Sequence, residues 1–459
     1  MLFILLIILF ISASFAGEGE IIRLGRDEFV ETAVKNEPRF KENRMALLIK
    51  EEKIEQIRYG ALLPKFEFSM LTGIVPGLKR DTDYYGQSVR SWDFTKMGPY
   101  FGMNIQAAQP LNYGQLRMGL KAAQADFQQK KMEVEGKENS LKAELLSYYY
   151  GYLLAMEMDK LAQDGHKQMR KAADKLEEAL DDGDEDASQM DLLELQANFF
   201  DIDKAVWEAQ TGLKKARLAA KFALGLPDSV SFEPADSVLS AVSDFVPSLD
   251  SLKNWAGASH PDIRRLTAGL EATSMQMELA SAKLAPEFFV MGEFEYAKSW
   301  AGDRTNLSKN AFAQDPVNRL SGAFGVGLKY KLNFWNQWEN YKLARIENRI
   351  LRQTESYASR GIDLQIEEKY DEFLKAKGIL ESARNALRKT EGMLKGAALQ
   401  YDLNPSKTSG LLANAYKKNL LMKKDYYFAV YEYNMAVAKL FAQAGYLFSE
   451  KNAVFSKKP

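Results

Sequence analysis

Hydrophobic and polar residues recur along this chain with two spacings, one typical of helices and one typical of strands. Asp27–Gly60 carries apolar residues three and four positions apart, which predicts a helix that ends before Pro64. Tyr113–Leu180 consists almost entirely of helix-forming residues and predicts a single helix about 100 Å long. Four shorter segments alternate apolar and polar residues with a period of two, which predicts β-strands. These strands are Phe66–Met70, Phe101–Ala107, Phe288–Tyr296 and Phe324–Leu332.

The remaining apolar patterns predict four further helices. Leu192, Leu195 and Phe199 follow the three- and four-residue spacing by which helices pack in coiled coils. In each half of the chain, one long helix matches the length of two shorter helices placed end to end. Such helices pack as an antiparallel array in which two short helices lie beside one long helix. The further helices are Ala187–Leu226, Leu249–Ala285, Gln337–Leu399 and Gly410–Tyr446.

The order of these elements occurs twice, with about 220 residues between matching positions. Asn36-Glu37-Pro38 is matched by Ser259-His260-Pro261, and Leu63-Pro64 is matched by Ala285-Pro286. The pattern predicts an internal two-fold repeat with a helix–strand–strand–helix–helix unit in each copy. The predicted boundaries are a first repeat at 17–226, a linker rich in Ser, Asp and Pro at 227–247, a second repeat at 248–447 and a tail at 448–459.

The N-terminus has the pattern of a secretory signal peptide. Leu2–Ile11 is an apolar block too short to span a bilayer, and Ser14 and Ala16 are small residues placed as before a cleavage site. We expect residues 1–16 to be removed, although no Lys or Arg precedes the block. The chain contains no Cys, so disulfides and a lipid-modified cysteine are excluded. Its 61 basic and 62 acidic residues balance, which argues against a nucleic-acid partner.

Charged residues fall on the strand faces opposite the apolar residues, which favours a water-filled lumen over a soluble sheet packed on helices. These residues are Glu67, Glu293, Glu295, Lys329 and Lys331. The polar and aromatic connections Ile74–Pro99 and Lys298–Ser321 are expected as external loops. Four strands cannot close a barrel, and lipid does not tolerate open strand edges. We therefore expect three copies to form one twelve-stranded barrel.

Together these motifs resemble the TolC-like outer-membrane efflux protein family. The resemblance covers Leu24–Tyr446 and includes the strand-to-helix turn at Gln109-Pro110-Leu111 and the helix end at Leu224-Gly225-Leu226-Pro227. It implies an α+β membrane protein, in which a homotrimeric twelve-stranded transmembrane β-barrel in the outer membrane continues into a long α-helical periplasmic tube. It also implies an exit duct of a tripartite efflux or type I secretion system. The implied partners are a periplasmic adaptor protein, an inner-membrane transporter and outer-membrane lipid.

The resemblance places a periplasmic gate at the helix tips, after the long helix of each repeat. The acidic run at 181–186 is either a cation-favouring ring at the entrance or a solvated turn that caps the next helix. The second tip departs from the acidic pattern that many family members carry, because Ser409-Gly410-Leu411-Leu412 contains no acid. The candidate gate residues are Asp181, Asp182, Asp184, Glu185, Asp186, Asp402, Leu403, Asn404, Ser409 and Leu412.

Other patterns carry less chemistry. His166 and His260 are the only histidines, and without Cys or a ligand-like spacing they predict no metal site. No phosphate loop, catalytic triad or carboxylate pair predicts an enzyme or a cofactor. Four tryptophans beside the strands form either an interfacial belt or ordinary packing: Trp92, Trp300, Trp335 and Trp338. The alternative function is a periplasmic coiled-coil scaffold or adaptor without a channel.

Overall fold

The computed structural model describes residues 21–82, 84–86, 88–183, 188–197, 199–227, 229–243, 245–301, 317–330, 332–403 and 405–445. The expected signal peptide and the tail at 448–459 lie outside these residues. The chain divides into two compact units. The helical unit comprises Met1–Ala46, Lys131–Arg264 and Glu355–Pro459, and the sheet unit comprises Leu47–Lys130 and Arg265–Thr354.

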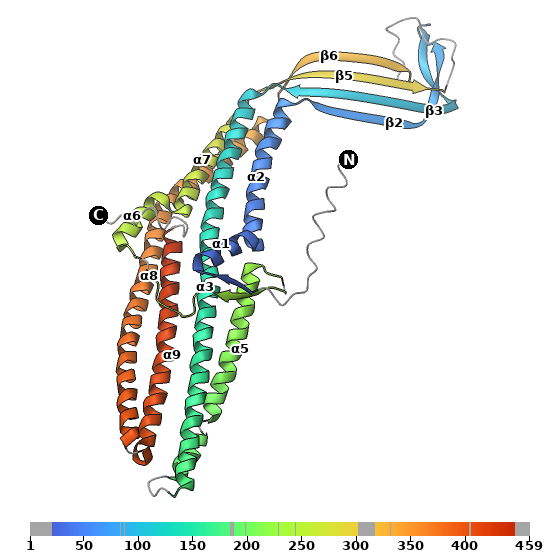
Figure 1. The fold of residues 1–459 in the computed structure, drawn as a ribbon. Coiled ribbons are helices and arrows are strands. Elements are labelled where there is room, and N and C mark those ends of the chain that lie inside the picture. Colours follow the sequence, from blue (N-terminus) through green and yellow to red (C-terminus); the bar gives the residue numbers. More distant parts are fainter. Residues whose placement is uncertain are drawn as a thin grey trace, which may run out of the picture. The chain divides into compact units, whose positions relative to one another are not determined.

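Helices account for most of the described chain (Figure 1). No helix among the described residues has an apolar stretch long enough to cross a membrane. The helices are α1 (Arg26–Asn36), α2 (Pro38–Leu62), α3 (Tyr113–Asp181), α4 (Gln189–Ala197), α5 (Phe199–Leu224), α6 (Leu249–Ser259), α7 (Pro261–Ala282), α8 (Phe334–Leu403) and α9 (Pro405–Gln443).

Two predicted helices are each broken by a proline, which corrects the sequence-based boundaries. The predicted helix Asp27–Gly60 is α1 and α2, and the predicted helix Leu249–Ala285 is α6 and α7. Glu37 and His260 hold extended backbone at the two breaks. A proline disfavours helical backbone in the residue before it and is well placed as the first residue of a helix. At each break one helix ends and the next begins at the proline; we call each break a corner.

The sheet unit contains one antiparallel sheet of order β2-β3-β5-β6 (Figure 1). β2 and β3 are longer than predicted, because they pair through most of Ile74–Pro99, where the sequence suggested an external loop. β6 ends at Lys329, before the predicted end at Leu332. The register shifts between Pro76 and Gly77, so Gly and Pro mark a bulge rather than the end of the strands. Lys331 and most of the Lys298–Ser321 connection lie outside the described residues. The strands are β2 (Lys65–Thr82), β3 (Ser88–Pro110), β5 (Glu287–Ser299) and β6 (Arg319–Lys329).

The helical unit has its core around a small parallel sheet that the sequence did not reveal. Strand β1 (Ile21–Leu24) pairs with β4 (Ser231–Pro234), which lies inside the predicted linker. Phe232 of β4 is fully buried, and its ring centroid lies 5.2 Å from that of Phe29. The linker is therefore part of the core.

The run Tyr148-Tyr149-Tyr150 belongs mainly to this core. Tyr149 is fully buried, and its hydroxyl donates a hydrogen bond to Asp236 Oδ2 at 2.6 Å. Burial raises the pKa of Tyr149 far above its ordinary value, with the Asp236 carboxylate acting in the same direction. Tyr150 is also buried, and Tyr148 lies at the edge, where it contacts Glu144. Packing is the role that the structure gives to these tyrosines.

Candidate functional site

The sheet has one polar and one apolar face. The register pairs Glu67 with Gln106 and Gln106 with Glu293, so these three side chains form a row across the polar face. Asn104 and Gln106 both donate hydrogen bonds to Glu293 Oε1, at 2.8 and 3.0 Å. Glu295 lies on the same face and pairs with Arg319 at 3.0 Å. The predicted alternation is confirmed for Glu67, Glu293, Glu295 and Lys329.

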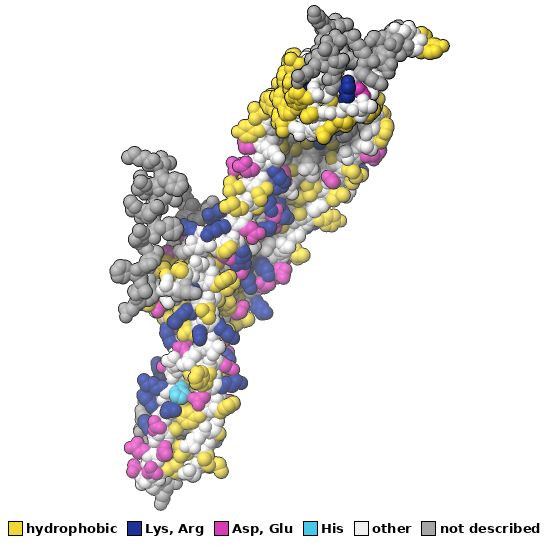
Figure 2. All heavy atoms as spheres, turned by 90° about the vertical axis from the view of Figure 1, so that its right-hand side faces the viewer, with side chains coloured by type: hydrophobic (Ala, Val, Ile, Leu, Met, Phe, Trp, Pro, Cys, Tyr) yellow, Lys and Arg dark blue, Asp and Glu magenta, His cyan; other side chains and the backbone are white. Residues whose placement is uncertain are grey.

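The opposite face of the sheet is apolar and open to solvent in the single chain. Phe324 is 80% exposed and Val326 is 72% exposed, although large apolar side chains are usually buried. Figure 2 shows hydrophobic side chains gathered on this sheet. A contiguous apolar surface of this kind marks a membrane or protein contact. Its exposed members are Phe66, Phe68, Met70, Ile74, Ile105, Phe288, Phe294, Leu320, Phe324, Val326 and Leu328.

Within the described residues, β2 and β6 are the edge strands of the sheet, and the outer edge of each has no partner strand. Consecutive strands are antiparallel, so these two edges run in opposite directions. Unpaired edges expose N–H and C=O groups that template further strand pairing. The four tryptophans named above are each at least 45% exposed, which places them away from any core of the single chain.

Among the described candidate gate residues, Asp181 and Leu403 are the last residues of the long helices α3 and α8. Asp181 and Asp182 are exposed, and Gly183 has a left-handed φ of 77° that lets the chain turn after α3. Figure 2 shows acidic side chains gathered toward this end of the helices. Leu403 is 86% exposed at the end of α8, and Leu412 is half-buried in α9. Asp184, Glu185, Asp186 and Asn404 lie outside the described residues, as do the side chains of Asp402 and Ser409.

Helix α3 forms one helix hairpin with α4 and α5, and α8 forms a second one with α9. The two hairpins contact each other near these ends. The Lys175 Nζ atom of α3 lies 5.4 Å from the centroid of the Tyr401 ring of α8, in a cation–π contact. Further along, the Tyr416 hydroxyl of α9 donates to the main-chain oxygen of Asp164 at 3.4 Å. Burial raises the pKa of Tyr416 to about 12. The sequence carried no signal for either contact.

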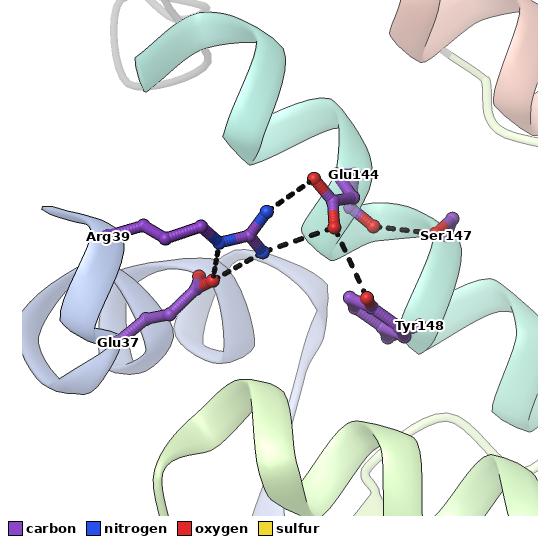
Figure 3. A network of polar contacts seen from close by, with 5 residues as sticks. All are labelled: Glu37, Arg39, Glu144, Ser147 and Tyr148. Carbon is purple, nitrogen blue, oxygen red and sulfur yellow. Dashed lines mark hydrogen bonds and ion pairs between the residues drawn. The ribbon is translucent and has the colours of Figure 1, made fainter. Parts of the chain in front are cut away.

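The first corner, between α1 and α2, is held by a network of charged groups (Figure 3). Arg39 donates to both Glu144 oxygens, at 2.8 and 3.1 Å, and also pairs with Glu37. Glu37 is 3% exposed, and its Oε2 is buried without a hydrogen-bond partner in the described chain. The hydrogen bond from Arg39 holds the pKa of Glu144 below its ordinary value, and one from Tyr148 contributes.

The second corner, between α6 and α7, is held by neutral hydrogen bonds. His260 is 4% exposed, and its Nε2 lies 2.9 Å from the main-chain oxygen of Gln443. Because a carbonyl only accepts, Nε2 carries the proton, and Nδ1 accepts from the Asp262 N–H at 3.1 Å. His166 is elsewhere, 3.3 Å from Asp203 on the helix surface. Within the described residues no group of metal-ligating side chains comes together.

Neither a protein-family model nor a curated protein sequence matches the chain. Solved structures do match. The CmeC outer membrane channel of Campylobacter jejuni has a TM-score of 0.68 and 14% identity, over 92% of this chain and 85% of that one. The open state of the MtrE outer membrane channel of Neisseria gonorrhoeae has a TM-score of 0.69 and 14% identity, over 95% and 93%. The chain has the TolC-like fold.

The outer membrane protein VceC of Vibrio cholerae supports the same assignment, with a TM-score of 0.66 and 13% identity over 92% of this chain and 96% of that one. The coverage extends over the helices and the sheet of the TolC-like fold alike. The sequence resemblance is thereby confirmed for the fold. Identities of this size carry the arrangement of the chain and not the roles of individual residues.

Proposed function

We propose that this protein is a passive outer-membrane channel, the exit duct of a tripartite efflux or type I secretion system. The observation that carries the proposal is the sheet: one face is apolar and exposed, the other is polar, and both edges are unpaired. A lipid-facing surface on one side and a wet lumen on the other require this division. The likeness to outer membrane channels supports a conduit rather than an enzyme.

The sheet geometry supports a homotrimer. Because β2 and β6 run in opposite directions, β6 of one copy can pair antiparallel with β2 of the next. Three copies then give twelve strands without a free edge, whereas a barrel of about eight strands is already filled by its side chains. Ile350, Tyr357 and Leu364 of α8 are exposed at seven-residue steps, the spacing by which helices of neighbouring copies pack.

In this assembly the helices extend into the periplasm, where an adaptor protein and an inner-membrane transporter dock. The gate lies at the helix ends that carry Asp181, Asp182 and Leu403. The Lys175–Tyr401 contact supports this position, since a cation–π contact worth about 0.5–1 kcal/mol is weak enough for docking partners to break. Opening is then a shift of population toward separated hairpins, driven by partners that bind the open state better.

Electron microscopy of the detergent-purified full-length protein tests the assembly. The expected result is a hollow particle with threefold symmetry and a helical tube about 100 Å long. A monomeric rod, or a particle that stays soluble without detergent, would contradict the barrel and leave the periplasmic scaffold as the better account.

Single-channel conductance in planar bilayers tests the gate. Lys175→Ala should raise the fraction of time spent open, while Lys167→Ala, an exposed lysine on the same helix, serves as the matched control. Asp181→Asn/Asp182→Asn tests the acidic ring, and unchanged cation preference in that variant would reduce the acids to a solvated turn. Equal open times for the two lysine variants would remove the tip contact from the gate.

A further inference from the structure

The sheet unit contains an open pocket of about 630 Å³ where its helices meet the sheet. The walls come from α2, the first turns of α3, the end of α7 and the first residues of β2 and β5. This volume lies within the range of small-molecule sites, about 300–1,000 Å³. None of the candidate gate residues that the structure describes lines it.

The charges at this pocket leave a positive surplus. Lys50 is matched by Asp126, with Nζ 2.6 Å from Oδ2. Glu287 also lines the pocket, and its charge offsets one further lysine. Lys53 and Lys65 also line the pocket, and neither forms an ion pair with another described residue. The lining thus holds three lysines against the two acids Asp126 and Glu287, which leaves one net positive charge per chain for a ligand.

The N-terminus of α3 adds to this positive potential. Tyr113 and Gln115, in the first turn of α3, line the pocket. The first N–H groups of a helix have no partner within it, and the helix dipole favours an anion there. Two lysines and a helix N-terminus that line one pocket are complementary to a sulfate, phosphate or carboxylate group.

The floor of the same pocket is apolar. Ile57, Leu116 and Leu279 come from three different helices and are only partly exposed, so they offer a surface for a hydrocarbon or aromatic body. We propose that this pocket binds an anionic amphiphile, with its charged group at Lys53 and Lys65 and its apolar part on this floor.

The position of the pocket identifies the ligand as cargo rather than membrane lipid. Lys65 and Glu287 share the polar face of the sheet with Glu67 and Glu293, opposite the face suited to lipid. This step rests on the proposed function, in which the polar face lines the duct. The pocket is then a binding site on the wall of the lumen, and anionic amphiphiles are a class of compound that passes through the duct.

Calorimetric titration of the full-length protein in nanodiscs of zwitterionic lipid tests the site. The probe is octyl sulfate below its micelle concentration, compared with octanol and with inorganic sulfate. Octyl sulfate should bind at least tenfold more tightly than either, and added salt should weaken it. Lys53→Gln/Lys65→Gln should lower its affinity at least tenfold, while Lys121→Gln, an exposed lysine of α3 outside the pocket, should leave it unchanged.

Equal binding of octyl sulfate and octanol, or unchanged affinity in the double variant, would overturn the proposal. The same preparations are also measured for single-channel conductance, which separates the two claims. Conductance without octyl sulfate binding refutes only the pocket. Binding that depends on Lys53 and Lys65 without conductance refutes the channel and retains an anion site. Preserved circular dichroism in the double variant excludes unfolding as the cause of lost binding.

Discussion

The two helix corners of the helical unit have the same backbone conformation but different side-chain interactions. Glu37 at the first corner has φ −66° and ψ 130°, and His260 at the second has φ −62° and ψ 129°. Each N–H bonds to the carbonyl four residues earlier, at 2.8 and 2.9 Å, and each residue precedes a proline that opens the next helix. The backbone of the corner is thus obtained twice from the same local signal.

Both corners are also closed by the end of a later helix. Gly225 follows α5 and lies against Asn36, whose Nδ2 donates to the Leu224 oxygen at 3.1 Å. Gly445 follows α9 and lies against Pro261, while His260 reaches the Gln443 oxygen. Each corner therefore fastens the last turn of the helix that returns to it.

The side chains that fill the corners differ in charge. Glu37 is a buried acid that depends on Arg39, whereas His260 is neutral and is satisfied by main-chain groups. A buried charge is tolerated only while it is paired, and a neutral group needs only its hydrogen bonds. Proline and glycine set the backbone conformation of both corners. The buried polar side chain determines which substitution destabilises each corner.

The largest effect is expected from Arg39→Ala. The substitution leaves the Glu37 carboxylate buried and unpaired, which should cost about 3–5 kcal/mol of unfolding free energy. Denaturant unfolding of the full-length protein, followed by circular dichroism, measures the loss. The double variant Glu37→Gln/Arg39→Gln removes both charges and should lose less. A double variant as unstable as the single one would show that packing of Arg39, and not its charge, holds the corner.

Replacing the glycine beside each corner by alanine should lower the free energy of unfolding, and more at the second corner than at the first. Both have left-handed backbone, with φ of 62° at Gly225 and 73° at Gly445, so Ala is strained by about 1–2 kcal/mol at either. At Gly445 an added Cβ would also lie 2.7 Å from Pro261 Cδ, whereas at Gly225 the nearest atom is 3.2 Å away. Gly445→Ala should therefore cost about 3 kcal/mol and Gly225→Ala about half of that. The reverse order in denaturant unfolding would contradict the closer fit of the second corner.

The two histidines provide a matched pair for the next effect. His260→Ala leaves the Gln443 carbonyl and the Asp262 N–H without this side chain, which should cost roughly 2 kcal/mol. His166→Ala should cost less than about 0.5 kcal/mol, because His166 lies on the helix surface. Thermal melts of both variants measure the difference. Similar losses would mean that the corner does not depend on the imidazole.

The helices, the strand cores and the sheet faces could be predicted from periodicity, since each depends on residues close in sequence. The corners were missed although Pro38 and Pro261 were present, because the apolar spacing continues across both prolines. The strand extensions were missed for the opposite reason: Pro76, Gly77 and Pro99 are typical of loops. There, pairing across the hairpin outweighs local preference.

The features of the candidate site also divide into those that local sequence predicts and those that it does not. The polar and apolar sheet faces follow from alternation, and the tips follow from where the long helices end. The partners of Arg39 could not be predicted, because Glu144 lies 105 positions away and no motif joins them. Similarly, Lys53 and Lys65 come together with α3 only through the turn from helices to sheet. Contacts that depend on tertiary packing carry no local signal.

The smallest effect expected is a pH dependence confined to the first corner. Arg39 lowers the pKa of Glu144 in the folded chain, so the stabilisation is complete above the ordinary carboxyl pKa of about 4.5 and is lost as the pH falls through the lowered value. Since Glu144 is substantially exposed, the pair is worth only about 0.2–1 kcal/mol. The unfolding free energy, measured with denaturant over about three pH units around that carboxyl pKa, should change less steeply with pH in Glu144→Gln than in the unmodified protein. Identical slopes would mean that Arg39 serves the buried Glu37 alone, which would make the two corners differ by one charge pair and not by a network.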